Sequence, residues 1–359
     1  MTTAGLLAGI RVLDFGIWRP VPYATQLLAE MGADVIKIEP PGGDPMRTFP
    51  ELFAILNVGK RAVAIDLKDP EQREAVRGLA ATADVVIEGF RPGVAGRLGI
   101  GYDDVRARNP ATVYCSVSGY GQSGPMRDLP GHDLNFQALA GTIAPRVPGG
   151  EPVVGRPPVA DLAAGAFAAM AISAALVRVA RSGEGDYLDV AMADILATWT
   201  GPLPEIRRAD GQPMGGGAAG YGTFRTADDQ WIALGVLAEQ PLWRALATTL
   251  GLAELAELSF AERSDRMTEL NTQLAAVIGR ADRASLVERL TRAGAPVSPV
   301  REAGELVADP QLLARGVVRR TADGATEMTH PVHYQEHPAG RSDAVPPLRH
   351  GVAALPAWP

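Results

Sequence analysis

The sequence has little of the chemistry that marks several classes of protein. It contains a single cysteine, Cys115, in 359 residues, which excludes an intrachain disulfide and fits a reducing compartment. The stretch around it, VYCSVS, is typical of a buried strand, so we expect an inert thiol. Lysine and arginine number 34 against 41 aspartates and glutamates, and the net charge is −7. This balance does not indicate a nucleic-acid-binding surface.

Long uncharged apolar runs are also missing. The longest, from Leu162 to Val177, is shorter than the ~20 residues that a bilayer span needs. It is rich in alanine and flanked by Asp161 and Arg178, which favours a helix buried in protein. The N-terminal stretch lacks a basic segment followed by a long apolar one, as a signal peptide would have. We therefore expect a cytoplasmic protein that does not enter a membrane.

Strand-like and helix-like segments alternate over the first 120 residues. Apolar, β-branched runs predict strands at 11–16, 34–39, 62–67, 84–90 and 112–118. Helical patterns lie between them, for example at 69–83, and this alternation predicts βαβ units on a parallel sheet. Near-continuous valine and isoleucine indicate strands that are covered on both faces. The sequence therefore predicts an α/β fold.

The composition changes after residue 200 and predicts further parts. Proline and glycine are frequent in GPLPEIRRADGQPMGGGAAGY, which indicates a linker. A hairpin with ADDQ as its turn follows, and then helical patterns, including one at 262–279. We expect a large domain at 1–200, a linker at 201–221, a small α+β domain at 222–315, and a C-terminal segment at 316–359 that returns to the large domain.

Two residues are candidates for moving protons or attacking a substrate. His132 opens the stretch GHDLNFQALAG, and the other four histidines all lie in the last thirty residues. An imidazole titrates near working pH and suits a general base; a histidine that caps the segment or lies satisfied in the core is the alternative. Asp161 opens the alanine-rich segment, where burial raises the pKa of a carboxyl group and a helix start lowers it. It suits a proton donor or a shielded nucleophile, with a plain helix cap as the alternative.

Cations near the ends of predicted strands suggest a binding site for anions. Lys37 lies in the second strand, and Arg91 and Arg97 follow the fourth. Ligands of open α/β sheets gather beyond the carboxyl ends of the strands, where such cations can hold phosphates. Isolated surface charges are the alternative. The C-terminal histidines are interrupted by prolines and joined by no cysteine, so we expect no metal site.

Four stretches are distinctive when taken together: LLAEMGADVIKIEPPGGDPMR, VGKRAVAIDLK, DVVIEGFRPGVAGRLGIGYDDV and YCSVSGYGQSGPMRDLPGHDLNFQALAG. They resemble the class III CoA-transferase (CaiB/BaiF) family, which includes the α-methylacyl-CoA racemases. The resemblance implies a large Rossmann-like domain without a dinucleotide fingerprint, a small α+β domain, and an interlocked homodimer. One departure is Pro40 after Glu39, where the family often has an arginine; Arg47 is the residue that would compensate.

The resemblance also implies the ligand. It predicts an acyl-CoA thioester substrate, with coenzyme A as part of that substrate, no tightly bound cofactor, no metal and no nucleic acid. By position, the residues implied to lie near CoA are Lys37, Ala64, Ile65, Asp66, Leu67, Gly89, Phe90, Arg91, Arg97, Gly131, Asp133, Leu134, Asn135 and Phe136.

The family supports two reactions. In racemases, the counterparts of His132 and Asp161 flank the α-carbon of the substrate and exchange its proton, and Glu239 falls within one residue of a further racemase glutamate. GHDLN resembles this form, so we expect racemisation of 2-methylacyl-CoA thioesters with these three residues as the catalytic set. In transferases, the counterpart of Asp161 attacks the thioester and carries the acyl group as an anhydride. That reaction, and a non-catalytic CoA-binding subunit, are the alternatives.

Overall fold

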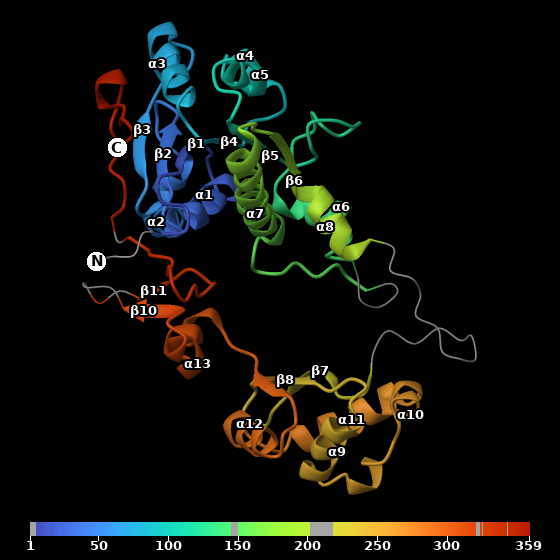
Figure 1. Ribbon diagram of the computed structural model, residues 1–359. Coiled ribbons are helices and arrows are strands. Elements are labelled where there is room, and N and C mark those ends of the chain that lie inside the picture. The colour runs from blue at the N-terminus through green and yellow to red at the C-terminus, as the bar shows by residue number, and fades with distance from the viewer. Residues whose placement is uncertain (1–4, 145–149, 202–217, 321–323, 325, 343) are drawn as a thin grey trace. The chain divides into compact units, whose positions relative to one another are not determined.

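The computed structural model describes residues 5–144, 150–201, 218–320, 324, 326–342 and 344–359 (Figure 1). The chain divides into two compact units, one of Met1–Pro202 with Leu313–Pro359 and one of Leu203–Leu312. Most of the linker expected at 201–221 lies outside the described residues, so the finer domain boundaries stay a prediction.

A six-stranded parallel sheet forms the centre of the first unit, in the order β3-β2-β1-β4-β5-β6. Its strands are β1 (Arg11–Phe15), β2 (Asp34–Glu39), β3 (Arg61–Ala64), β4 (Val85–Glu88), β5 (Val113–Ser118) and β6 (Tyr187–Ala191). Their valines and isoleucines are buried, because both faces of the sheet are covered. This confirms the predicted Rossmann-like α/β fold. The strand order reverses between β1 and β4, a place where such sheets bind ligands.

Helices surround this sheet. They are α1 (Pro20–Glu30), α2 (Pro50–Asn57), α3 (Pro70–Ala80), α4 (Val94–Arg97), α5 (Tyr102–Arg106), α6 (Asp133–Leu139), α7 (Val159–Ser182) and α8 (Met192–Thr200). Short 3-10 helices lie at Pro45–Thr48 and Val352–Ala354. Sequence chemistry explains individual boundaries: α3 begins after Asp69, whose carboxylate accepts hydrogen bonds from the backbone N–H groups of Glu71 and Gln72.

Helix α7 packs closely along α1. By length and apolar composition α7 could cross a membrane, and it is the one such helix in the described part of the chain. Its small residues instead face the core: Ala160, Ala164 and Ala168, spaced by one turn, are all buried in the cluster beneath the sheet. A Cβ at Gly165 would lie 2.7 Å from the carbonyl oxygen of Pro20, so the two backbones approach at this glycine. The alanines therefore fit a tight interface with α1.

The C-terminal segment runs beside β3 (Figure 1). The N–H of Ala64 donates to the carbonyl of Arg349, and the carbonyl of Ala64 accepts from the N–H of Gly351. Further along, Arg341 pairs with Glu30 of α1. The segment includes the strands β10 (Val318–Arg320) and β11 (Thr326–Met328), which pair with each other. It thus covers the edge of the sheet at β3.

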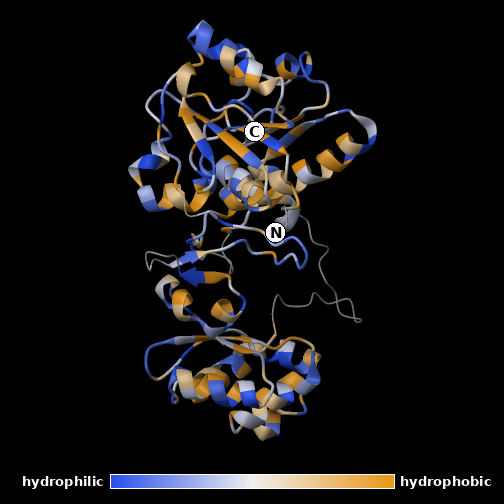
Figure 2. Ribbon diagram, turned by 60° about the vertical axis from the view of Figure 1, so that its left-hand side comes forward, coloured by the Kyte–Doolittle hydropathy of each residue, from blue (hydrophilic) through white to orange (hydrophobic). Residues whose placement is uncertain are grey.

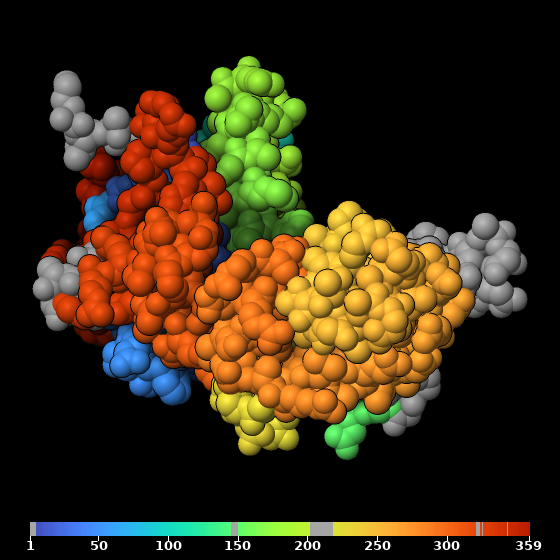
Figure 3. All heavy atoms as spheres, turned by 90° about the horizontal axis from the view of Figure 1, so that it is seen from below, coloured from blue at the N-terminus to red at the C-terminus, as the bar shows by residue number. Residues whose placement is uncertain are grey.

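The second unit is a small α+β body. Its antiparallel sheet has the order β7-β8-β9, and its elements are β7 (Tyr221–Arg225), β8 (Trp231–Gly235), α9 (Gln240–Thr249), α10 (Phe260–Asp265), α11 (Met267–Ile278), α12 (Arg283–Arg292) and β9 (Val297–Pro299). Two 3-10 helices, Ala253–Leu255 and Ala303–Ala308, lie among them, and α13 (Pro310–Ala314) follows. Each helix has a polar and an apolar side (Figure 2), and the apolar sides bury Trp243, Leu246 and Leu274. Figure 3 shows this unit in yellow to orange.

Candidate active site

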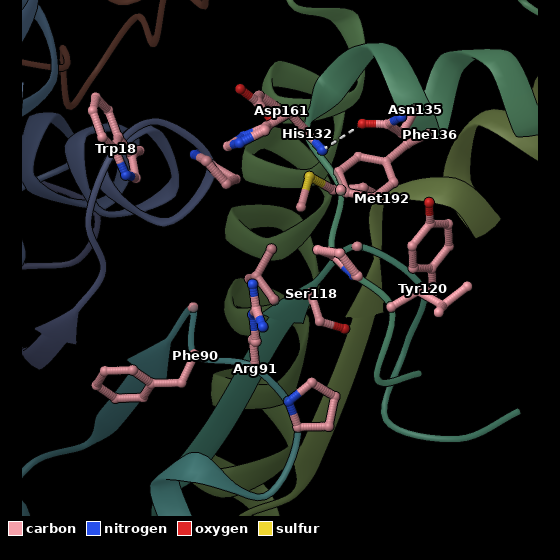
Figure 4. Close-up of a pocket in the computed structure, with 18 of the residues that line it drawn as sticks. Trp18, Phe90, Arg91, Ser118, Tyr120, His132, Asn135, Phe136, Asp161 and Met192 are labelled. Atoms are coloured by element: carbon pink, nitrogen blue, oxygen red, sulfur yellow. Dashed lines mark hydrogen bonds between the residues drawn. The ribbon is translucent and has the colours of Figure 1, made fainter. Parts of the chain in front are cut away.

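A cavity of about 630 Å³ lies at the carboxyl ends of the central strands. Its walls come from the turn after β1, from the turn Gly89–Pro92 after β4, from Ser118–Tyr120 after β5, and from the starts of α6 and α7 (Figure 4). Its volume is within the range of small-molecule sites, and its position is the one that the reversal of strand order predicts.

The structure brings His132 and Asp161 to the same cavity, although they are far apart in the sequence. Their side chains lie next to each other at one end of it, while Phe90 and Arg91 lie at the other end (Figure 4). His132 is exposed at the N-cap of α6, and its backbone N–H donates to Oδ1 of Asn135 at 3.0 Å. Asp161 stands in the first turn of α7.

The carboxylate of Asp133 ties α6 to α7. Its Oδ1 accepts the backbone N–H groups of Ala160 at 2.7 Å and of Asp161 at 3.2 Å, and its Oδ2 accepts from Nε2 of Gln137 at 2.5 Å. Asp133 therefore caps the start of α7 from another helix and holds Asp161 in place. It does not line the cavity, where the sequence predicted a contact with CoA.

Asp161 has a poorly solvated carboxyl group. Its pKa is raised to about 6, mainly by burial and also by the negative charge of Asp133, while the positive charges of Arg19 and His132 act in the opposite direction. At pH 7 the carboxylate is therefore mostly ionised but has few water molecules to stabilise it. Such a group is a stronger nucleophile than a fully hydrated carboxylate.

A buried ion pair shapes the turn after β1. Nζ of Lys37 lies 3.0 Å from Oδ2 of Asp44, and both side chains are fully buried. Lys37 also donates to the carbonyl of Gly16, and Oδ1 of Asp44 accepts the N–H of Trp18 at 3.3 Å. Trp18 has φ = 60°, a left-handed conformation that these contacts help to hold. Lys37 thus supports the turn that brings Trp18 to the cavity. It does not line the cavity itself, and its role in binding CoA stays a prediction.

The other residues predicted to contact CoA divide into two groups. The cavity is lined by Gly89, Phe90, Arg91, Gly131, Asn135 and Phe136. It is not lined by Ala64, Ile65, Asp66, Leu67, Arg97 or Leu134. The backbone of Ala64 is paired with the C-terminal segment, and Leu134 is exposed on α6. Their roles in binding CoA stay predictions.

Arg47 is engaged elsewhere. Its guanidinium donates to both carboxylate oxygens of Glu39 at 2.7 Å, and Glu39 is buried. To bind the nucleotide part of CoA, as the sequence suggested, Arg47 would have to give up this bidentate pair with Glu39.

Glu239 belongs to the second unit, where it is the N-cap of α9. Its Oε2 accepts the N–H of Leu237 at 3.2 Å. Its catalytic role stays a prediction. The described ranges contain no group of three or more histidine, cysteine, aspartate or glutamate side chains that could hold a metal ion.

Sequence reasoning missed several residues that line the cavity. Trp18, Tyr120, Arg127 and Met192 all contribute to its walls. The first three lie in the loops that follow β1 and β5, in GIWRPVP and GYGQSGPMRDLPG. Their position at the carboxyl ends of parallel strands was the available signal.

Comparisons with known proteins agree on the family. A family model, "CoA-transferase family III", matches residues 7–350. The chain is similar to the succinate–glutarate CoA-transferase of Agrobacterium fabrum, with 33% identity over 87% of this chain and 84% of that one. It is also 33% identical to the acetyl-CoA:oxalate CoA-transferase of Acetobacter aceti, over 88% and 85%.

A solved structure supports the same assignment. The CaiB/BaiF family protein from Brucella suis superimposes with a TM-score of 0.83 at 29% identity, covering 98% of this chain and 99% of that one. The racemase expectation is not supported, because the relatives named above are CoA-transferases, and the transferase alternative fits them better. The match over nearly the whole chain shows that this protein belongs to CoA-transferase family III.

Proposed function

We propose that the protein moves CoA from an acyl-CoA thioester to a carboxylic acid, with Asp161 as the nucleophile. The observation that supports this most directly is the poorly hydrated carboxyl group of Asp161, with a pKa of about 6, at one end of the cavity. A nucleophile of this kind must be ionised at working pH and yet shielded from water, which would hydrolyse an activated acyl group.

The reaction proceeds by four exchanges at carbonyl carbons. The carboxylate of Asp161 attacks the thioester, the carbon–sulfur bond breaks, and the acyl group becomes a mixed anhydride on Asp161. The CoA thiolate then attacks the aspartyl carbonyl, which releases the donor acid and leaves CoA on Asp161 as a thioester. The acceptor carboxylate attacks that thioester, and the thiolate returns to the acceptor's acyl carbon. Asp161 is regenerated and no proton is gained or lost.

His132 is the neighbour best placed to stabilise the oxyanions of these steps. It lies beside Asp161 at the cavity (Figure 4), and an imidazole N–H can donate to an oxygen that gains negative charge. Arg91 and Arg127 line the cavity as well, and their charges suit the anionic groups of CoA or of an acid. The acceptor class suggested by the named relatives is the short dicarboxylic acids, such as succinate, glutarate and oxalate.

Oxygen isotopes test this proposal directly. The purified protein is incubated with succinyl-CoA and glutarate labelled with oxygen-18 in its carboxylates. Each turnover should leave one labelled oxygen on Asp161, detectable by mass spectrometry of the peptide that contains it. Glutaryl-CoA should form, and Asp161→Asn should form none. Hydroxylamine should trap an adduct on the same peptide.

The same incubation in deuterium oxide, with a 2-methylacyl-CoA, separates this reaction from racemisation. Transfer predicts no deuterium at the α-carbon. Deuterium that enters the α-position, together with an unlabelled Asp161, would contradict the proposal.

A further inference from the structure

Glu88 is a buried acid directly behind one wall of the cavity. It ends β4, immediately before the turn Gly89–Pro92, and only 4% of its surface is exposed. Its Oε2 accepts the backbone N–H of Phe90 at 2.6 Å, and its Oε1 accepts the hydroxyl of Ser116. The carboxylate thus links the wall to the neighbouring strand β5.

The partners of Glu88 continue across the sheet. Ser116 is the register partner of Glu88 on β5, and Asp189 is the partner of Ser116 on β6. The hydroxyl of Tyr187 donates to Oγ of Ser116 at 3.2 Å. Oδ2 of Asp189 accepts the N–H of Gln122 in the turn after β5. One row of polar side chains therefore holds the turns after both β4 and β5.

No cation neutralises Glu88 in the part of the chain that the structure describes: its hydrogen-bond donors are neutral, and the charge that acts on it is that of Asp189. Its pKa is raised to about 7, mainly by burial and also by the charge of Asp189, while the hydrogen bonds from Ser116 and Phe90 act in the opposite direction. A buried carboxyl group without a cation costs stability. Its presence here calls for a role in shaping the turn.

The turn that Glu88 holds fixes the position of Arg91. Gly89 lies against α1, where a Cβ would come within 3.2 Å of Cγ2 of Val21. The ring of Phe90 packs against the ring of Phe15, with 6.3 Å between the two ring centroids. Arg91 then extends into the cavity, at the end away from Asp161 (Figure 4).

We propose that Glu88 is a positioning residue for substrate binding, because it anchors the N–H of Phe90 and thereby holds Arg91 facing the anionic part of a CoA thioester. The identity of this ligand rests on the proposed function. Since Glu88 stands behind the wall at the far end from Asp161, its loss weakens binding more than it slows acyl transfer.

The hydrogen-bond pattern predicts which substitution is tolerated. A glutamine at position 88 can accept the N–H of Phe90 through its carbonyl and donate its NH₂ to Oγ of Ser116, so both links survive. Glu88→Ala loses both links. Ser116→Ala loses one and leaves the link to Phe90. Val63→Ala, at a buried position on β3 that does not line the cavity, is the control for general destabilisation.

Three measurements on the purified protein test the inference: hydrogen exchange at the amide of Phe90, the Kd for acetyl-CoA by calorimetry, and kcat with KM for transfer. In Glu88→Ala we expect exchange at Phe90 to be faster and Kd to be weaker, each by about 10-fold, because the buried hydrogen bond to the N–H of Phe90 is lost. Its kcat should stay within about threefold. Glu88→Gln should match the wild type in all three measurements. Val63→Ala should change neither the Kd for acetyl-CoA nor the rate of hydrogen exchange at the Phe90 amide.

Several outcomes would overturn the inference. One is a folded Glu88→Ala with unchanged exchange at Phe90 and unchanged Kd; another is a Glu88→Gln as impaired as Glu88→Ala. If Glu88→Ala does not fold, Ser116→Ala is the deciding variant. It removes the hydrogen bond from Ser116 to Glu88 and should speed hydrogen exchange at Phe90 by about threefold. An unchanged rate would refute the link from Ser116 through Glu88 to Phe90. A wild type that binds acetyl-CoA without transferring it contradicts the proposed function alone. A wild type that binds no acetyl-CoA also contradicts the proposed function. In that case hydrogen exchange at Phe90 still tests whether Glu88 holds the N–H of Phe90.

Discussion

The burial of Asp161 predicts that this residue lowers the stability of the folded protein at neutral pH. Its pKa is about 6 in the folded protein, against an ordinary value of 3.8. Between these values the folded state keeps a proton that the unfolded chain has released, so stability falls as pH rises from about 4 to about 6. The shift corresponds to about 3 kcal/mol as an upper limit, and partial exposure of the side chain reduces this to about 2 kcal/mol.

The isosteric change Asp161→Asn removes the charge and should therefore stabilise the protein while it abolishes transfer. We expect a gain of about 2 kcal/mol in the free energy of unfolding at pH 7.5, and less than half of that at pH 4.5, where the wild-type carboxyl is already protonated in the folded state. Urea unfolding curves at both pH values, followed by circular dichroism, measure the difference. Asp103→Asn, at an exposed position in the first turn of α5, is the matched control and should give no such gain.

A specific result would refute this reasoning. If Asp161→Asn were no more stable than the wild type at pH 7.5, with an unchanged slope against urea, the carboxylate would be adequately stabilised where it stands. The start of α7 and the cations Arg19 and His132 would then outweigh burial. The shielded nucleophile on which the proposed reaction depends would lose its physical basis.

Three further predictions follow from buried groups. Lys60→Met removes one of the two lysines, Lys60 and Lys37, whose charges stabilise the buried carboxylate of Asp14, 3.3 Å from Nζ of Lys60. Urea titration should show a loss of up to about 3–5 kcal/mol, and a loss below about 1 kcal/mol would contradict the pairing. Asp133→Asn removes a negative charge that raises the pKa of Asp161 yet keeps an oxygen for the N–H of Ala160, so the acidic limb of kcat/KM should move below pH 6, and an unmoved limb would count against this coupling. Burial raises the pKa of the Cys115 thiol, so thiol reagents should label native protein only as fast as it unfolds; rapid labelling would show that the strand opens.

The strands could be predicted because most are short runs in which valine, isoleucine and other apolar residues predominate. The segment 34–39 was predicted as a strand and forms β2 with the same bounds. The prediction at 62–67 was too long, since β3 ends at Ala64, where the C-terminal segment pairs with it. Such a partner, nearly 300 residues away, leaves no local signal. The single helix predicted at 262–279 is broken at Arg266, which has a non-helical ψ of 19°, into α10 and α11.

The candidate site divides in the same way. His132 and Asp161 could be identified from their residue types and from the motifs around them, because chemistry of this kind depends on side chains that sequence displays directly. The cap that Asp133 provides, and the burial of Lys37 against Asp44, could not, since both depend on how distant backbone segments meet. A lysine within a strand gives no sign of whether a carboxylate will lie over it.

The expectation of racemisation has a physical cause. A histidine beside an aspartate can move a proton or donate a hydrogen bond to an oxyanion, and the pattern GHD is compatible with both. The backbone N–H of His132 is held by Asn135 and that of Asp161 by Asp133, so both residues are positioned at the cavity. Their positions fit either reaction, and it is the named relatives that favour transfer.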